Sequence, residues 1–160
     1  YCRRLVGDVG VGTMDQGPKE QIGKTLYGRR KGKPLRAHLA QTYQEHYARL
    51  DIFGGMGPKP IDPVALFDQA GDLVLEVGFG GGEHLLARAL EDPNSNFLGV
   101  EPFENGMAKM VRAVVAHNLT NIRLHEGDAR EVLAHLPKGS LARAMVLYPD
   151  PWPKLRHHKR

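Results

Sequence analysis

The amino-acid sequence predicts an α/β protein with a parallel sheet covered by helices on both faces. Short apolar runs of strand length alternate along the chain with segments of helical periodicity. This alternation is typical of parallel strands joined by right-handed helical crossovers. Glycine or acidic residues follow each predicted strand. Since the carboxyl ends of parallel strands share one edge of the sheet, a ligand crevice is expected there, as in Rossmann-like folds.

The segment 73–84, LVLEVGFGGGEH, is central to this prediction. Its apolar run with β-branched residues is typical of a buried strand, and its glycines indicate a tight turn into a helix. Without a Cβ, a glycine lets a ligand lie against the backbone and near the amides of the next helix. The glycines predicted to cradle a cofactor are Gly78, Gly80 and Gly82.

Two carboxylates restrict the ligand that this turn would accept. Glu83 stands where the dinucleotide motif requires a third small residue, and its charge disfavours a pyrophosphate at that point. An NAD-linked dehydrogenase is therefore disfavoured. Glu76, inside the strand, suits a cationic or hydroxyl-bearing ligand. S-adenosyl-L-methionine has an ammonium group, a sulfonium and ribose hydroxyls, although the glycine spacing alone fits other Rossmann-like sites equally well.

Two helices are expected before the central strand. Residues 38–50 carry a stripe of apolar and aromatic side chains at helical spacing, which indicates packing. The stripe consists of Leu39, Tyr43, Tyr47 and Leu50. A second helix is expected over residues 64–69, because Asp62 can cap it and Pro63 suits its first position.

Three more strands and three more helices are expected after the glycines. Turn residues at 92–94 separate the first helix from the next strand. The helix at 104–117 has five apolar residues at the spacing of a core face. The predicted helices cover 83–90, 104–117 and 129–136, and the predicted strands cover 96–101, 121–125 and 141–147.

Two acidic residues follow the second and third strands. Glu101 lies about twenty residues beyond the glycines, where a carboxylate reaches the ribose hydroxyls of an adenosine ligand. Asp128 is placed to accept a hydrogen bond from an exocyclic amine such as adenine N6. It equally suits the N-cap of the helix 129–136, and the two roles are compatible.

The loop at residues 148–154 is stiffened by three prolines and displays Asp150, Trp152 and Lys154. These side chains suit a purine: the carboxylate accepts from guanine N1–H and N2–H, the indole stacks, and the ammonium meets a phosphate or carbonyl. An ordinary packed aromatic is the alternative for Trp152. A run that could contact phosphates follows, namely Arg156, His157, His158, Lys159 and Arg160.

Charge is distributed unevenly along the chain. Residues 1–36 contain nine Lys and Arg against three Asp and Glu, and residues 154–160 contain four against none, whereas the sequence between them is acidic. Basic ends on an acidic body suit an anionic polymer such as nucleic acid, and the alternative is that they only increase solubility. Residues 1–36 are expected to form a flexible arm, and residues 37–160 a partial domain.

Composition limits the class of protein. One cysteine, Cys2, permits no internal disulfide and fits a reducing compartment. No apolar run has the length of a membrane span, and the sequence starts without a secretory signal, so a cytoplasmic protein is expected. His157 and His158 have no acidic or cysteine neighbour in sequence, and no metal is predicted. A monomer is expected, with a dimer as the alternative.

Four segments of this sequence resemble the bacterial tRNA (guanine-N7-)-methyltransferase family, which contains class I S-adenosyl-L-methionine-dependent enzymes. They are LVLEVGFGGGEHLL, FLGVEPFENGMAKM, NIRLHEGDAREVL and LYPDPWPKLRHHKR. The Y-P-D-P-W-P-K stretch is highly specific to that family, and the basic segment at 27–36 resembles its N-terminal region. The resemblance covers more than half of the chain.

The resemblance implies a reaction and several roles. The reaction is methylation of N7 of a guanine in the variable loop of tRNA. Asp150 is implied as the catalytic residue and Lys154 as a substrate contact. The positions implied to bind S-adenosyl-L-methionine are Glu76, Glu101, Asp128 and Asp150.

The implied chemistry demands little of the protein. Guanine N7 already exposes a lone pair, so that in-line placement against the methyl sulfonium does much of the work. Methylation leaves a cationic purine, which a carboxylate at Asp150 would stabilise electrostatically.

The sequence departs from the family pattern at its C-terminal end. The family continues through further strands, a Thr-Asp segment and a C-terminal T-x-x-E motif, none of which follows the signature loop in this sequence. An incomplete sheet is therefore expected, with an unpaired apolar edge at the fourth strand. The alternative function is that of a catalytically inactive fragment that retains only cofactor or RNA binding.

Overall fold

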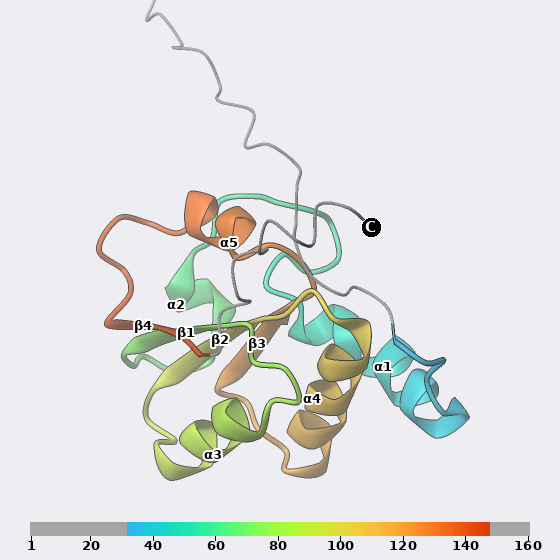
Figure 1. The fold of residues 1–160 in the computed structure, drawn as a ribbon. Coiled ribbons are helices and arrows are strands. Elements are labelled where there is room, and N and C mark those ends of the chain that lie inside the picture. The colour runs from blue at the N-terminus through green and yellow to red at the C-terminus, as the bar shows by residue number, and fades with distance from the viewer. Residues whose placement is uncertain (1–31, 148–160) are drawn as a thin grey trace, which may run out of the picture.

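The computed structural model describes residues 32–147, and these form the predicted α/β architecture around one sheet (Figure 1). The described strands are all parallel and lie in the order β3-β2-β1-β4. Their bounds are Leu73–Val77 for β1, Asn96–Val100 for β2, Ile122–His125 for β3 and Arg143–Val146 for β4. Since helices separate these parallel strands in sequence, the predicted fold class is confirmed.

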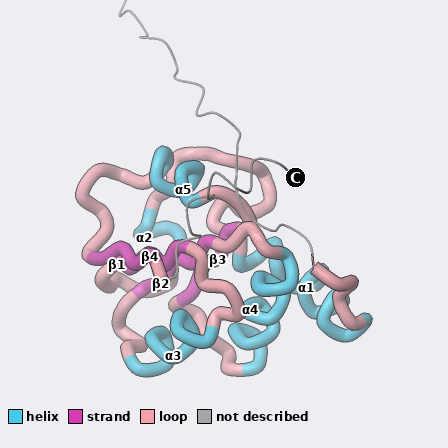
Figure 2. Tube along the Cα trace, viewed as in Figure 1, coloured by secondary structure: helices cyan, strands magenta, loops and turns pink. Residues whose placement is uncertain are grey.

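Helices cover both faces of the sheet, with α1, α3 and α4 on one face and α2 and α5 on the other (Figures 1 and 2). The bounds are Ala37–Leu50 for α1, Pro63–Leu66 for α2, Glu83–Glu91 for α3, Glu104–Ala116 for α4 and Ala129–His135 for α5. All five helices begin within one or two residues of their predicted starts. Asp62 caps α2 as predicted, since its carboxylate accepts from the N–H groups of Val64 and Ala65.

The alternation of side chains along the strands explains the two helical layers. On β1, Leu73 and Leu75 are buried on the side of Val132 of α5, whereas Val74 packs with the cluster that includes Met110 of α4. On β2, Phe97 joins the cluster of α1, α3 and α4, and its neighbour Leu98 joins the other cluster. Each strand therefore buries both faces, as parallel sheets require.

Two elements, α2 and β4, are shorter than predicted by more than one residue. Helix α2 ends at Leu66 instead of residue 69, because Phe67 adopts an extended conformation that buries its ring. The ring also lies under the Arg123 guanidinium, at 5.0 Å. Strand β4 covers only Arg143–Val146 instead of residues 141–147.

The edge position of β4 agrees with the prediction of an unpaired strand. Among the described strands, β4 pairs only with β1. Its Val146 side chain is 59% exposed, whereas Val100 of β2 is 1% exposed. Among the described residues, this edge therefore has no strand on its outer side, whereas each central strand has a neighbour on both sides.

Candidate functional site

The glycine turn between β1 and α3 has the backbone geometry that its sequence predicts. Gly78, Gly80 and Gly82 have φ values of 72°, 59° and 86°, which lie in the left-handed region that favours glycine. The Gly78 N–H donates to the Val100 carbonyl oxygen at 2.8 Å, which joins the turn to the end of β2. The turn therefore brings the N-terminus of α3 to the carboxyl edge of the sheet.

Glu101 fixes the same turn from the neighbouring strand. Its Oε2 accepts from the Gly80 N–H at 2.7 Å, and its Oε1 accepts from the Phe103 N–H at 2.9 Å. The residue is 6% exposed. A carboxylate has about four acceptor positions, so these two bonds leave capacity to accept ligand hydroxyls.

Helix α4 approaches the glycine turn closely through Gly106. A Cβ at this position would lie 2.1 Å from the Gly80 carbonyl oxygen, which is too short for two non-bonded atoms. Only glycine therefore allows this contact between the first turn of α4 and the glycine turn.

Glu76 is a buried carboxylate with a histidine partner. It is 1% exposed, and its Oε2 lies 2.7 Å from His84 Nδ1. The His84 side chain, on the first turn of α3, is 45% exposed. Burying a carboxylate without a hydrogen-bond partner costs free energy. The contact with His84 therefore stabilises the buried Glu76 side chain.

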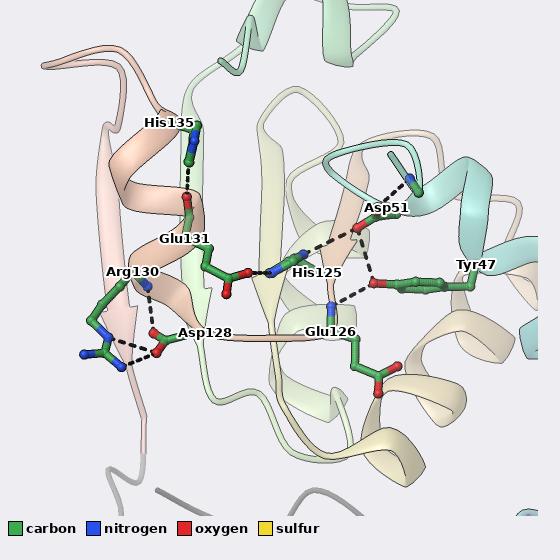
Figure 3. Close-up of polar contacts among 9 residues, drawn as sticks. Tyr47, Asp51, His125, Glu126, Asp128, Arg130, Glu131 and His135 are labelled. Atoms are coloured by element: carbon green, nitrogen blue, oxygen red, sulfur yellow. Dashed lines mark hydrogen bonds and ion pairs between the residues drawn. The ribbon is translucent and has the colours of Figure 1, made fainter. Parts of the chain in front are cut away.

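Asp128 caps α5 and pairs with an arginine at the same time (Figure 3). Its Oδ1 accepts from the Arg130 N–H at 2.9 Å, and its Oδ2 accepts from Arg130 Nε at 2.8 Å and from Nη2. Hydrogen bonds from Arg130 hold the pKa of Asp128 below its usual value, although partial burial acts in the opposite direction. The predicted N-cap role is confirmed. A ligand amine at this carboxylate would share it with the guanidinium.

A polar network ties α1 to the loop that carries Asp128. His125 Nδ1 lies 3.5 Å from Asp51 Oδ1, and its Nε2 lies 3.1 Å from Glu131 Oε2 (Figure 3). The Tyr47 hydroxyl donates to Asp51 at 3.2 Å and accepts from the Glu126 N–H at 2.8 Å. The end of β3 is thus held between α1 and α5.

The charges in this network shift the pKa values of its buried members. Burial lowers the pKa of His125, but hydrogen bonds that its ring donates to Asp51 and Glu131, together with the charges of these carboxylates, raise it above its usual value. Burial raises the pKa of Asp51, but hydrogen bonds from His125 and the Gly55 N–H, with the charge of His125, leave it below its usual value. The two shifts favour an ion pair between the residues.

The structure brings three predicted site residues to one edge of the sheet. Glu76 lies near the end of β1, Glu101 directly follows β2, and Asp128 lies just beyond β3. These strands are neighbours in the sheet. The predicted site residues that lie outside the described part of the chain are Asp150, Trp152, Lys154, Arg156, His157, His158, Lys159 and Arg160.

Several residues that support the site were not singled out from the sequence. His84 lies two positions after Gly82 in sequence. Its contact with Glu76 depends on how the glycine turn places α3 relative to β1. Gly106 stands inside a predicted helix, where glycine can indicate a close approach of another backbone segment. Asp51 and His125 are far apart in sequence, so no local pattern indicates their contact.

Within residues 32–147, no helix is long and apolar enough to cross a membrane. The same residues include no group of three or more His, Cys, Asp or Glu side chains arranged to hold a metal ion.

Comparison with known proteins places these features in a family. A family model described as "Putative methyltransferase" matches residues 70–160. A tRNA (guanine-N(7)-)-methyltransferase of Rhodopseudomonas palustris is 49% identical over 138 residues, which cover 85% of this chain and 51% of that protein. A protein of the same name from Nitrobacter winogradskyi is 47% identical over 161 residues, which cover 98% of this chain and 61% of that protein.

A third relative and a solved structure complete the comparison. The tRNA (guanine-N(7)-)-methyltransferase of Rhizobium meliloti is 49% identical, over 86% of this chain and 59% of that protein. The chain thus spans about half the length of the curated relatives it matches. A solved structure titled "Structure of an antibiotic related Methyltransferase" aligns with a TM-score of 0.43 and 18% identity, over 59% of this chain and 47% of that one. The resemblance noted in the sequence is confirmed by the curated relatives.

Proposed function

We propose that this chain carries the donor-binding half of a tRNA guanine-N7 methyltransferase. The premise is that the chain belongs to the methyltransferase family whose model matches residues 70–160. Membership of the family implies a methyl donor. The observation that carries the finer proposal is the set of carboxylates Glu76, Glu101 and Asp128 at one edge of three neighbouring strands, around a glycine turn.

S-adenosyl-L-methionine fits these residues chemically. The turn around Gly80 offers open backbone, since no atom of residues 32–147 lies within 4 Å of a Cβ placed there. Glu101 keeps acceptor capacity for two ribose hydroxyls, and Asp128 keeps it for an exocyclic amine. The donor would supply an electrophilic methyl group on a sulfonium.

The part that the protein plays in the transfer is positioning and charge stabilisation. A guanine base must meet the donor at the carboxyl edge of the sheet, and β4 leads from this edge into the loop at 148–154. Guanine N7 needs no deprotonation before it attacks, because its lone pair is free. We infer that Asp150 stabilises the positive charge that develops on the purine, and that Lys154 and Trp152 contact the substrate. The run from Arg156 to Arg160 would contact phosphates.

Three further points belong to the same proposal. The substrate is tRNA, whose phosphates would be met by the basic segments at both ends of the sequence. The site of action is the cytoplasm, where tRNA is available. The domain boundary lies at residue 37, where α1 begins after the basic segment.

Methyl transfer tests the proposal and separates it from the alternative of an inactive, binding-only chain. The protein is incubated with labelled S-adenosyl-L-methionine and unmodified tRNA, and the tRNA is digested to nucleosides. Label in 7-methylguanosine supports the enzyme. Binding of tRNA and S-adenosylhomocysteine without any transferred label would favour the inactive chain. If calorimetry showed tighter binding of NAD than of S-adenosylhomocysteine, S-adenosyl-L-methionine would not be the donor.

A further inference from the structure

A cationic hollow lies between the start of α1 and the first turns of α4. Its volume is about 320 Å³, near the lower end of the ~300–1,000 Å³ typical of small-ligand sites. Leu35 and Leu39 contribute apolar wall, whereas Arg36, Lys109 and Arg112 contribute positive charge. The residues that line it within the described part of the chain include no carboxylate.

The cations come from two elements that the fold holds together. Lys109 and Arg112 are three residues apart on α4, so they lie on one face of the helix. Arg36 immediately precedes α1, and its carbonyl oxygen accepts from the N–H groups of Leu39 and Ala40. All three cations are exposed, so their charges face water instead of the core.

Asn105 fixes the basic segment against α4 beside the hollow. Its Oδ1 accepts from the Gly32 N–H at 3.0 Å, and its Nδ2 donates to the Lys33 carbonyl oxygen at 2.8 Å. A side-chain amide that binds both a donor and an acceptor of another segment sets the direction of that segment. The chain therefore enters the hollow from Lys33 along a defined path.

The hollow adjoins the donor edge of the sheet. Asn105, which lines it, is followed by Gly106, which contacts the Gly80 carbonyl oxygen closely enough to exclude a Cβ. The glycine turn and the hollow thus lie on either side of the first turn of α4. A polymer held in the hollow would be close to a reaction at the glycine turn.

We propose that this hollow binds a nucleotide unit of the RNA backbone during methyl transfer. The phosphate would meet Arg36, Lys109 and Arg112, and the sugar or base would lie on Leu35 and Leu39. The hollow combines positive charge with an apolar wall, and a nucleotide combines an anionic group with apolar ring faces. The inference deepens the proposed function, because it assigns a substrate contact outside the loop at 148–154.

The double variant Lys109→Ala/Arg112→Ala tests the proposal by its salt dependence. Both side chains would neutralise the phosphate of one nucleotide, and a lost phosphate contact reduces the salt slope of RNA binding by about 1. The dependence of log Kd for unmodified tRNA on log salt concentration should therefore be less steep by about 1. At about 0.1 M salt, we expect Kd and KM for tRNA to rise roughly tenfold. Because both side chains are exposed, kcat and the Kd of S-adenosylhomocysteine should stay unchanged.

A charge-matched control is available outside the hollow. Arg49→Ala/Lys138→Ala also removes an exposed Arg and an exposed Lys, one in the last turn of α1 and one after α5, and should change tRNA binding much less. A double variant at Lys109 and Arg112 that matches this control in salt slope and Kd would overturn the proposal, even if the wild-type protein methylates tRNA. If the wild-type protein transfers no methyl group, the proposed function fails, while the comparison of tRNA affinities still decides on the hollow.

Discussion

The Glu101 carboxylate accepts a hydrogen bond from the Gly80 N–H at 2.7 Å and so joins the end of β2 to the glycine turn after β1. The same carboxylate accepts from the Phe103 N–H at the start of α4. One buried side chain thus connects a strand, the turn and a helix. Any ligand hydroxyl that binds Glu101 would find a carboxylate already oriented by two backbone donors.

Glu101→Gln should weaken binding of S-adenosylhomocysteine. The amide has one oxygen, so one of the two backbone donors would face an NH₂ group instead of an acceptor. A hydrogen bond to a charged group contributes ~1.5–3 kcal/mol, and we expect Kd in calorimetry to rise at least tenfold. Glu91→Gln, on the exposed end of α3, is the matched control. Equal affinities for the two variants would refute the role of Glu101.

Gly106→Ala should lower both stability and cofactor affinity. At an open helical position the same change stabilises a protein by up to ~1 kcal/mol. Here the new methyl group would meet the Gly80 carbonyl oxygen and push α4 from the glycine turn. Chemical denaturation should show a loss of about 2 kcal/mol. An unchanged or higher free energy of unfolding would show that α4 does not touch the turn.

Substitutions at Asp128 should separate its two roles. Asparagine caps a helix as well as aspartate, whereas alanine costs about 1 kcal/mol. Asp128→Asn should therefore keep the free energy of unfolding and reduce affinity for S-adenosylhomocysteine, whereas Asp128→Ala should reduce both. Arg130→Ala should not weaken binding of S-adenosylhomocysteine, because Arg130 competes with the ligand for the Asp128 carboxylate. A loss of cofactor affinity in Arg130→Ala as large as in Asp128→Asn would assign binding to the ion pair instead.

The contact between His125 and Asp51 should make stability depend on pH. The raised pKa of His125 means that its contribution is complete below the ordinary histidine pKa and is lost as the pH rises through the raised value. The lowered pKa of Asp51 means that its contribution is complete above its ordinary pKa of 3.8 and is lost as the pH falls through the lowered value.

His125→Gln should therefore flatten the alkaline side of the stability profile. We expect the wild-type free energy of unfolding to fall by about 1 kcal/mol more than that of the variant between about pH 6 and about pH 9. The exposed His117 provides a control, since His117→Gln should leave the profile as in wild type. Parallel profiles for His125→Gln and wild type would show that the pair contributes no pH dependence.

The sequence predicted the fold from its periodicity, and helix starts were predicted well because caps are local signals. Asp62 and Asp128 are N-caps, and their side chains accept hydrogen bonds from backbone N–H groups in the first turns of α2 and α5. Helix ends were less predictable: α2 stops early because burial of Phe67 in the tertiary core outweighs the local pattern. The limits of β4 similarly depend on pairing with β1, which a single apolar run does not reveal.

The candidate site was predictable only where local sequence determines it. Glu76, Glu101 and Asp128 were identified because each lies at the end of a strand. Their partners were not, since His84 and Arg130 meet the carboxylates through the geometry of the following helices. The hollow between α1 and α4 depends on how two helices pack, and Arg36 precedes Lys109 and Arg112 by more than seventy residues in sequence.

The proposed reaction places the methyl group on N7 of guanine, and replacing that atom tests this directly. Two tRNA transcripts are compared, one with ordinary guanosine and one with 7-deazaguanosine, which has carbon in place of N7 and no lone pair there. We expect the protein to transfer label from S-adenosyl-L-methionine only to the ordinary transcript, although both transcripts bind with similar affinity. Equal incorporation of label into the two transcripts would contradict the assignment to guanine N7.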